Sequence, residues 1–186
     1  MNALDFTQLF KNTQPVEIEI GCGKGKFLLG RAEESPGLNF LGLDRVAKWM
    51  NIGKKKSGKL GLANLVFLQA EIREFLAQIP EQSIQAFHIY FPDPWPKRRH
   101  RKRRLIQPDF LEALEKKLMS GGVIEMATDD ADYFEHIERA ASDTGFLWNR
   151  IQKEDKRTHF PHLKTNYELK YETAGRRLCY LELVKK

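Results

Sequence analysis

The chain has 186 residues, 41% of them hydrophobic, which is enough for one substantial core but not for two ordinary domains. We therefore expect a single domain over residues 1–186. No segment approaches the roughly 18 consecutive apolar residues of a membrane helix, and Met1 to Pro15 lacks the basic and apolar regions of a secretion signal. Cys22 and Cys179 lack the spacing of a zinc site or a disulfide framework. The composition predicts a soluble, cytoplasmic protein with reduced thiols, no metal and no membrane partner.

Charge is concentrated in one segment. The formal net charge is +6, from 31 Lys and Arg against 25 Asp and Glu. Lys97–Arg104 (KRRHRKRR) contains seven of these Lys and Arg residues, so the rest of the chain has 24 Lys and Arg against 25 Asp and Glu. Such a one-sided run fits phosphate binding with release of counterions, so nucleic acid is the expected partner. A solvated loop and a nuclear-import-like signal are the alternative interpretations.

Short β-rich runs alternate with helical patterns along most of the chain. The expected strands are Val16–Ile20, Asn39–Leu43, Asn64–Leu68, Ile84–Tyr90, Gly122–Thr128, Phe146–Ile151 and Leu178–Val184. The expected helices are Lys26–Glu34, Arg45–Ser57, Ile72–Gln78, Pro108–Met119 and Ala131–Thr144. This alternation predicts an α/β fold with one Rossmann-like, doubly wound sheet, mostly parallel, which the last two strands close as an antiparallel hairpin. Lys153–Gly175 shows no strong periodicity, and a loop of that length is a candidate functional segment.

A glycine-rich turn, Gly21-Cys22-Gly23-Lys24-Gly25, follows the first expected strand and precedes a helix. Glycines permit a tight turn and close approach of the backbone to a nucleotide-like ligand. Glu19, directly before the turn, would repel a pyrophosphate but suits a zwitterionic amino-acid group. Asp44 lies about 20 residues past the turn, where an acid can accept hydrogen bonds from ribose hydroxyls.

Two further acids follow the third and fourth expected strands. Glu71 can approach an adenine amino group, although an N-terminal charge on the following helix is an equal alternative. Asp93 lies in a loop that three prolines stiffen, at the strand end that borders the ligand crevice of such sheets. A residue that only caps a turn is the alternative for Asp93. One acid after each of the first three strands favours a methyltransferase that uses S-adenosylmethionine over a dehydrogenase.

Five segments, in the order EIGCGKG, FLGLD, FPDPWPKRRHRKRR, ATDD and TNYE, resemble the bacterial tRNA (guanine-N7-)-methyltransferase family over nearly the whole chain. The FPDPW segment followed by a basic cluster is the most specific of them. The resemblance implies S-adenosylmethionine as methyl donor, S-adenosylhomocysteine as product and the variable-loop guanine (position 46) of tRNA as target. It implies no obligate protein partner, and it leaves monomer and homodimer open.

The resemblance also implies roles for matched positions. The expected cofactor-binding residues are Glu19, Gly21, Gly23, Asp44, Glu71 and Asp93, and Asp93 is also the expected catalytic residue. The expected substrate-binding residues are Lys97, Arg99, His100, Arg101, Lys102, Arg103, Arg104, Asp129, Thr165, Asn166, Tyr167 and Glu168. Four positions depart from the common pattern: Asp44 replaces Glu, Glu71 replaces Asp, and Asn166 and Tyr167 replace the Lys and Phe of TKFE.

The expected chemistry depends on positioning. Guanine N7 carries an available lone pair, so its methylation needs no prior proton removal, and alignment supplies much of the rate. Asp93 then serves as an acceptor for the guanine N1–H and N2 amino edge or as an electrostatic partner of the sulfonium. Asp129 and Glu168 are unranked candidates for holding the same edge. The alternatives are a methyltransferase that acts on another RNA or a small molecule, and an RNA-binding protein without catalysis.

Overall fold

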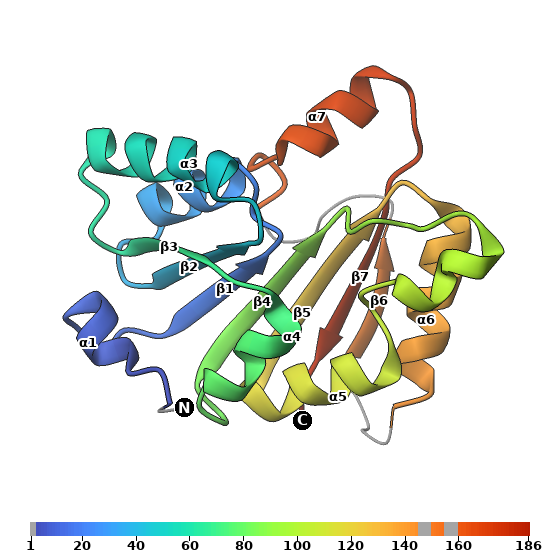
Figure 1. Cartoon of the computed structure of the whole chain (residues 1–186), viewed down its shortest axis with the longest axis horizontal. Helices are drawn as coiled ribbons and strands as arrows, with labels where there is room; N and C mark the ends of the chain where they lie inside the picture. The colour runs from blue at the N-terminus through green and yellow to red at the C-terminus, as the bar shows by residue number, and fades with distance from the viewer. Residues whose placement is uncertain (1–2, 145–149, 155–159) are drawn as a thin grey trace.

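The computed structural model describes residues 3–144, 150–154 and 160–186. In this part of the chain, seven strands form one sheet in the order β3-β2-β1-β4-β5-β7-β6, with helices on both faces (Figure 1). The strands are β1 (Val16–Ile20), β2 (Asn39–Asp44), β3 (Leu65–Gln69), β4 (Ile84–Tyr90), β5 (Leu118–Thr128), β6 (Arg150–Glu154) and β7 (Cys179–Val184). The helices are α1 (Phe6–Phe10), α2 (Lys26–Glu34), α3 (Ala47–Leu60), α4 (Ile72–Phe75), α5 (Pro108–Lys117), α6 (Ala131–Ser142) and α7 (Asn166–Thr173), with 3₁₀ segments η1 (Leu76–Gln78) and η2 (Arg98–Arg103).

The pairing of the strands confirms the expected fold class. Strands β1 to β5 pair in parallel, and β7 pairs antiparallel with both β5 and β6. The antiparallel pairing of β6 and β7 at the sheet edge is confirmed, with β7 on the inner side, but α7 lies between the two strands in sequence, so they do not form the expected hairpin. The first part of the strand expected at 146–151 lies outside the described residues.

Helix α7 was not expected, because it lies inside the segment 153–175 that shows no strong periodicity. The helix begins with a capping box, in which the Thr165 hydroxyl accepts from the Glu168 amide and the Glu168 carboxylate accepts from the Thr165 amide at 2.6 Å. Within α7 only Glu168 is buried. The helix therefore lacks the apolar stripe from which amphipathic helices are recognised.

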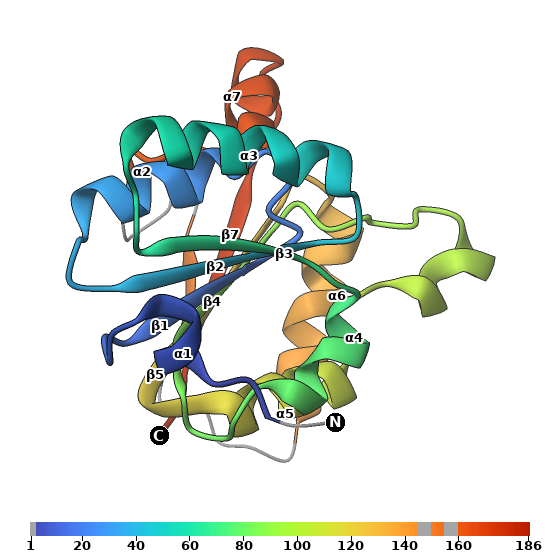
Figure 2. The ribbon, with the colours of Figure 1, turned by 60° about the vertical axis from the view of Figure 1, so that its left-hand side comes forward.

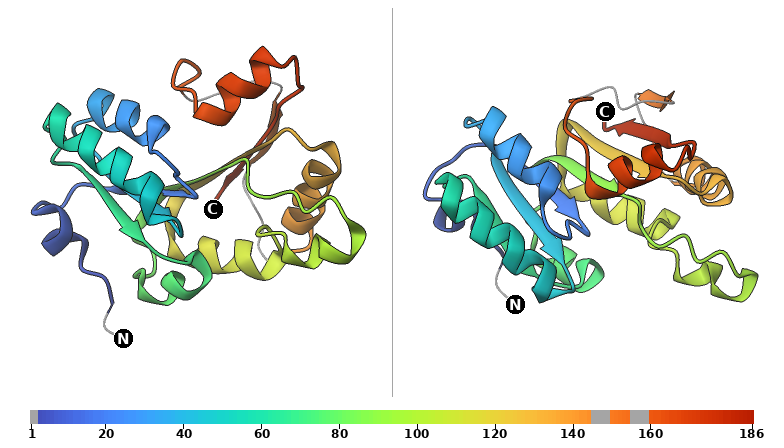
Figure 3. Two further views of the ribbon diagram at one scale, coloured as in Figure 1. Left: turned by 45° about the horizontal axis from the view of Figure 1, so that its top comes forward. Right: turned by 90° about the horizontal axis from the view of Figure 1, so that it is seen from above.

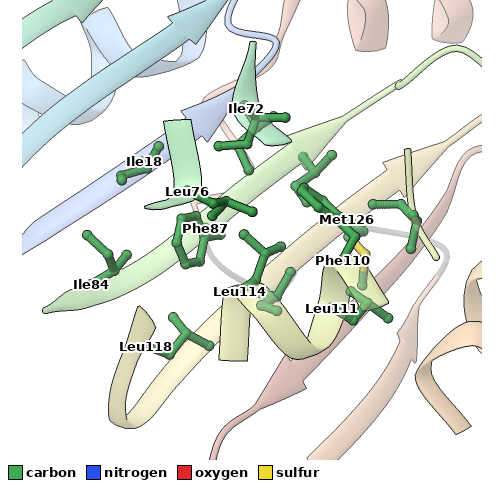
Figure 4. Packing of buried hydrophobic residues seen from close by; sticks show 14 of the residues in the cluster. Ile18, Ile72, Leu76, Ile84, Phe87, Phe110, Leu111, Leu114, Leu118 and Met126 are labelled. Atoms are coloured by element: carbon green, nitrogen blue, oxygen red, sulfur yellow. The ribbon is translucent and has the colours of Figure 1, made fainter. Parts of the chain in front are cut away.

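Two apolar layers cover the two faces of the sheet (Figure 2). On one face α4, α5 and α6 pack against the strands, and Figure 4 shows this contact from close by. Its labelled residues are Ile18, Ile72, Leu76, Ile84, Phe87, Phe110, Leu111, Leu114, Leu118 and Met126. On the other face α2 contributes Phe27 and Leu28, and α3 contributes Met50.

The parallel strands end at one edge of the sheet, and the loops that follow them gather there. Helix α7 lies above this edge (Figure 1). Figure 3 shows α7 between α2 and α3 on one side and η2 and α6 on the other. The edge therefore joins the glycine turn, the proline-rich loop, the basic segment and α7.

Candidate active site

The glycine turn after β1 is closed on the side of β2 and open on the other. The backbone at Gly21 and Gly23 has φ angles of 79° and 54°, which residues other than glycine rarely adopt. The amides of Gly21 and Cys22 donate to the Leu43 carbonyl at 2.8 and 3.1 Å, which joins the turn to the end of β2. A Cβ added at Gly21 or Gly23 would meet nothing within 4 Å. The turn thus presents bare backbone to open space.

Two buried residues support the turn from below. Glu19, the penultimate residue of β1, is 4% exposed, and Cys22 is 6% exposed. Burial raises the pKa of the Cys22 thiol, and the charges of Glu19 and Asp44 raise it further. The thiol therefore stays protonated and packs as a small apolar group, as expected of a structural cysteine.

Asp44 ends β2 and is bonded to the glycine turn. Its Oδ2 accepts a hydrogen bond from the Gly23 amide at 2.8 Å. Its carbonyl accepts from the Ala70 amide at 3.0 Å, which brings Glu71 to the same edge. The Glu71 carboxylate lies 3.4 Å from the Arg45 guanidinium, and although Glu71 stands at the N-cap of α4, its side chain makes no capping hydrogen bond. The structure thus brings the glycine turn, Asp44 and Glu71 together.

Asp93 lies in the loop after β4. The amide of Phe91 donates to the Ala127 carbonyl at 2.8 Å, and Phe91 and Trp95 have positive φ angles of 54° and 45°. Asp93 is exposed, and its carboxylate makes no hydrogen bond or ion pair with another residue in the described ranges. The turn-capping alternative therefore has no hydrogen bond to support it in this part of the chain, and the carboxylate is accessible to a ligand.

The basic segment divides into an anchor and an exposed set. Arg104 is 2% exposed and donates to the Pro94 carbonyl at 2.8 Å and to the Asp132 carboxylate. Arg101 pairs with Asp132 at 3.0 Å from an exposed position. Arg104 thus fixes the proline-rich loop to the start of α6, whereas the exposed cations are Lys97, Arg98, Arg99, Arg101, Lys102 and Arg103.

Asp129 follows β5 and is joined to the loop after α7. The Arg176 guanidinium pairs with the Asp129 carboxylate and lies 4.8 Å from the centre of the Tyr171 ring. Burial raises the pKa of Tyr171, and the charge of Asp129 raises it further. These contacts bring the end of β5 and helix α7 together.

The segment Thr165–Glu168 has two buried and two exposed residues. Glu168 is 2% exposed and accepts from the Tyr180 hydroxyl at 2.9 Å, in addition to its bond within the capping box. Tyr167 is 52% exposed and Asn166 is exposed. The Tyr167 ring forms a cluster with Phe91 and Tyr171, with ring centroids 5.5 to 6.2 Å apart. The segment therefore anchors α7 through its ends and presents Asn166 and Tyr167 at the edge.

A buried polar network, which the sequence did not predict, lies beneath this edge. Arg31 of α2 donates to Glu17 at 2.7 Å, and the other Glu17 oxygen lies 3.0 Å from His88 Nε2. His88 Nδ1 lies 3.0 Å from Glu125, whose carboxylate also accepts from the Tyr90 hydroxyl at 2.7 Å. All five residues are buried, with at most 8% of their surface exposed. The network links β1, β4, β5 and α2.

The network carries compensating charges. Burial opposes the charge on His88, but hydrogen bonds to Glu125 and Glu17 outweigh it and raise the pKa of His88 to about 9. Burial likewise opposes ionisation of Glu17, yet His88 and Arg31 hold the pKa of Glu17 below its usual value. An imidazolium and a guanidinium therefore stand among carboxylates in the interior.

No helix in the described residues combines the length and the hydropathy needed to cross a bilayer. No group of three or more His, Cys, Asp or Glu side chains in them could hold a metal ion.

Residues 13–181 match the family model described as "Putative methyltransferase". The chain is 32% identical to a tRNA (guanine-N(7)-)-methyltransferase of Rubrobacter xylanophilus, over 98% of this chain and 82% of that protein. It is 33% identical to the protein of that name from Geobacillus kaustophilus, over 96% and 82% of the two chains. It is 36% identical to the protein of the same name from Shewanella amazonensis, over 95% of this chain and 73% of that protein.

Solved structures share the fold at lower identity. The 16S rRNA methyltransferase KamB superposes with a TM-score of 0.69 at 16% identity, over 100% of this chain and 95% of that chain. An antibiotic-related methyltransferase gives a TM-score of 0.67 at 21% identity, over 99% and 95%. At these identities the similarity shows a common methyltransferase fold.

Proposed function

The chain belongs to the tRNA (guanine-N(7)-)-methyltransferase family and is therefore a methyltransferase, and on that premise we propose that it methylates N7 of the variable-loop guanine of tRNA with S-adenosylmethionine. The observation that carries the proposal is the glycine turn, open on one side and bonded to Asp44 through Gly23 on the other. The basic segment beside the same edge supports RNA as the substrate.

The residues at the edge fit the cofactor. Bare backbone at Gly21 and Gly23 leaves space for an amino-acid group, and acids near it suit the charge of a sulfonium cofactor. Asp44 is oriented by a backbone amide and would accept from ribose hydroxyls. Glu71 at the next strand end would approach the adenine. When bound, S-adenosylmethionine supplies an electrophilic methyl group and leaves as S-adenosylhomocysteine.

The chain's own contribution to the reaction is alignment. Guanine N7 carries an available lone pair, so no residue would need to remove a proton before methyl transfer. Asp93, exposed at the end of β4, would accept from the guanine N1–H and N2 amino group. These donors strengthen as positive charge develops on the ring, so a fixed carboxylate stabilises the transition state.

Asp129 and the aromatic cluster support the substrate. The ring of Tyr167 is exposed beside Phe91 and offers a flat surface to a base. Asp129 lies near the same cluster and is the better placed of two acids for the guanine edge. Glu168 is committed to its capping box and to Tyr180, so we assign it to holding α7 in place.

The basic segment would bind phosphates through its exposed cations, and Arg104 would act by fixing the loop. We further propose that residues 1–186 act as one domain without an obligate partner subunit, as a monomer or a homodimer. The support is that the described N- and C-terminal strands belong to one sheet.

The test is to incubate the protein with labelled S-adenosylmethionine and an unmodified tRNA transcript, then map methylation by cleavage at N7-methylguanine. We expect label at the variable-loop guanine, and none on a matched transcript with adenine at that position. Methylation elsewhere would assign another RNA target. Tight cofactor binding without methylation of tRNA would overturn the substrate, and RNA binding without any turnover would favour a non-catalytic role.

A further inference from the structure

Charge is segregated beyond the basic segment 97–104. Residues 45–70 contain six cations and no acid: Arg45, Lys48, Lys54, Lys55, Lys56 and Lys59. When the seven cations of residues 97–104 are also set aside, 18 of the 31 Lys and Arg residues remain against all 25 acids, a balance of −7. The chain therefore has two wholly cationic segments and an acidic remainder.

Helix α3 displays the second set to solvent. It buries only Met50, Gly53 and Ser57, and its five lysines are exposed. None of these lysines forms an ion pair with another residue in the described ranges. Helices α5 and α6, by contrast, mix acids with cations. Neighbouring like charges destabilise a helix, so solubility alone gives no reason for an acid-free helix.

The cationic face of α3 begins beside the glycine turn. Trp49 is 38% exposed, and its ring lies 4.9 Å from the Lys24 ammonium and 5.4 Å from that of Lys48. A Cβ at Gly53 would be 3.1 Å from the Lys24 carbonyl, so α3 packs directly on the turn. Cation–π contact thus holds two ammonium groups at the cofactor edge. From there the helix carries lysines along roughly 20 Å, at 1.5 Å per residue.

We propose that the outer face of α3, formed by Lys48, Lys54, Lys55, Lys56 and Lys59 together with Lys24 and Trp49, binds the sugar–phosphate backbone of the RNA substrate away from the target base. This proposal rests on the proposed function. Helix α3 follows the carboxyl end of β2 and η2 follows that of β4, and the two lie on opposite sides of α7 (Figure 3). An RNA seated on η2 therefore reaches α3 by crossing the active-site edge.

The same face fits a nucleic acid better than an anionic membrane. A helix that lies on a membrane inserts a continuous apolar face into the headgroup region. The exposed apolar residues of α3 include Trp49, Ile52 and Leu60, but Lys56 interrupts them, and the buried Met50 faces the core. The exposed surface is thus suited to phosphate contacts without insertion.

The test compares two charge-matched triple variants. Lys54→Gln, Lys55→Gln and Lys56→Gln neutralise the middle of α3, whereas Lys11→Gln, Lys116→Gln and Lys186→Gln neutralise exposed lysines near the opposite end of the sheet. Binding of unmodified tRNA is measured over a series of salt concentrations. Each lost phosphate contact reduces the slope of log affinity against log salt by about 0.7–0.9, so we expect a reduction of about 2–3 for the α3 variant and none for the control.

Further readouts separate this surface from the catalytic site. We expect the α3 variant to keep its affinity for S-adenosylmethionine and its kcat at saturating tRNA. Adding Arg99→Gln should reduce the slope additively if η2 and α3 contact different phosphates. An unchanged slope in the α3 variant of an active enzyme would overturn this surface and leave the proposed function standing. The α3 surface would also be refuted if the α3 variant lost binding to phosphatidylglycerol vesicles while its salt slope for tRNA binding stayed unchanged. Failure of the wild type to methylate tRNA would instead refute the proposed function.

Discussion

The guanidinium of Arg176 pairs with the carboxylate of Asp129, so the loop after α7 is joined to the end of β5. The Asp129 side chain is 13% exposed and that of Arg176 is 56% exposed, so the aspartate is the more buried partner of the pair. Because the contact is to Oδ2, the other carboxylate oxygen has a fixed direction. The pair therefore orients Asp129 for a substrate edge.

The first prediction concerns this pair. We expect Arg176→Ala to raise KM for tRNA by about three- to tenfold, because the Asp129 carboxylate would lose more conformational freedom when the substrate binds. The value of kcat should change by less than about twofold. Steady-state kinetics with unmodified tRNA measure both constants. Arg176→Lys, which keeps the charge, should recover part of the loss, and an unchanged KM in Arg176→Ala would remove Arg176 from substrate positioning.

Asp93→Asn tests the catalytic assignment. The substitution keeps the shape of the side chain but removes the negative charge that would stabilise the guanine as it is methylated. We therefore expect kcat to fall by about a hundredfold or more. Binding of tRNA should change by less than about threefold, because Asp93 contacts no described residue whose position the loop needs. Single-turnover kinetics and filter binding measure the two effects. Asp143→Asn, an exposed acid at the end of α6, is the matched control, and normal turnover in Asp93→Asn would refute the assignment.

The five parallel strands could be predicted because each contains a short β-rich run and helical patterns lie between these runs. The glycine turn and Asp44 could be paired from their spacing, since consecutive parallel strands end at one edge. Helix α7 was missed because Glu168 is its one buried residue, so it lacks an apolar stripe, although the T-x-x-E pattern of its capping box was visible in the sequence.

The buried network could not be predicted for a different reason. The run VEIEI alternates in hydrophobicity, which is typical of a strand with one solvated face, yet Glu17 and Glu19 are both buried. The partners that make burial of Glu17 tolerable lie 14 and 71 residues away, on α2 and β4. A pattern within one strand holds no information about them. The same limit concealed Arg176, which meets Asp129 only after α7 returns the chain to the sheet edge.

The third prediction distinguishes the structural role of Arg104 from the RNA-binding role of Arg99 in the basic segment. Arg104 is buried against Asp132 and the Pro94 carbonyl, so Arg104→Gln leaves polar groups poorly paired, and we expect a loss of about 2–4 kcal/mol in unfolding free energy. Arg99 is exposed, so Arg99→Gln should keep the melting temperature and reduce the salt slope of tRNA binding by about 0.7–0.9. Thermal denaturation and salt-dependent binding measure the two quantities. Equal melting temperatures for the two variants would show that Arg104 is not an anchor.

The last prediction concerns His88 and pH. The pKa of His88 is raised from 6.5 to about 9 in the folded protein, so its charged form is favoured by folding. The resulting stability is fully present below pH 6.5 and is lost as pH rises through 9. At 1.36 kcal/mol per pKa unit the contribution is on the order of 3 kcal/mol.

We therefore expect the stability difference between wild type and His88→Gln to be large at pH 6 and to shrink by pH 9.5, as measured by chemical denaturation at each pH. His136→Gln is the matched control, because burial lowers the pKa of His136, and its charged form is disfavoured by folding. The stability advantage of wild type over His136→Gln should therefore decrease as pH falls through 6.5, which is the opposite direction. A difference between wild type and His88→Gln that stays constant from pH 6 to 9.5 would mean that His88 is neutral in the folded protein, and that Glu17 and Glu125 are compensated by other groups.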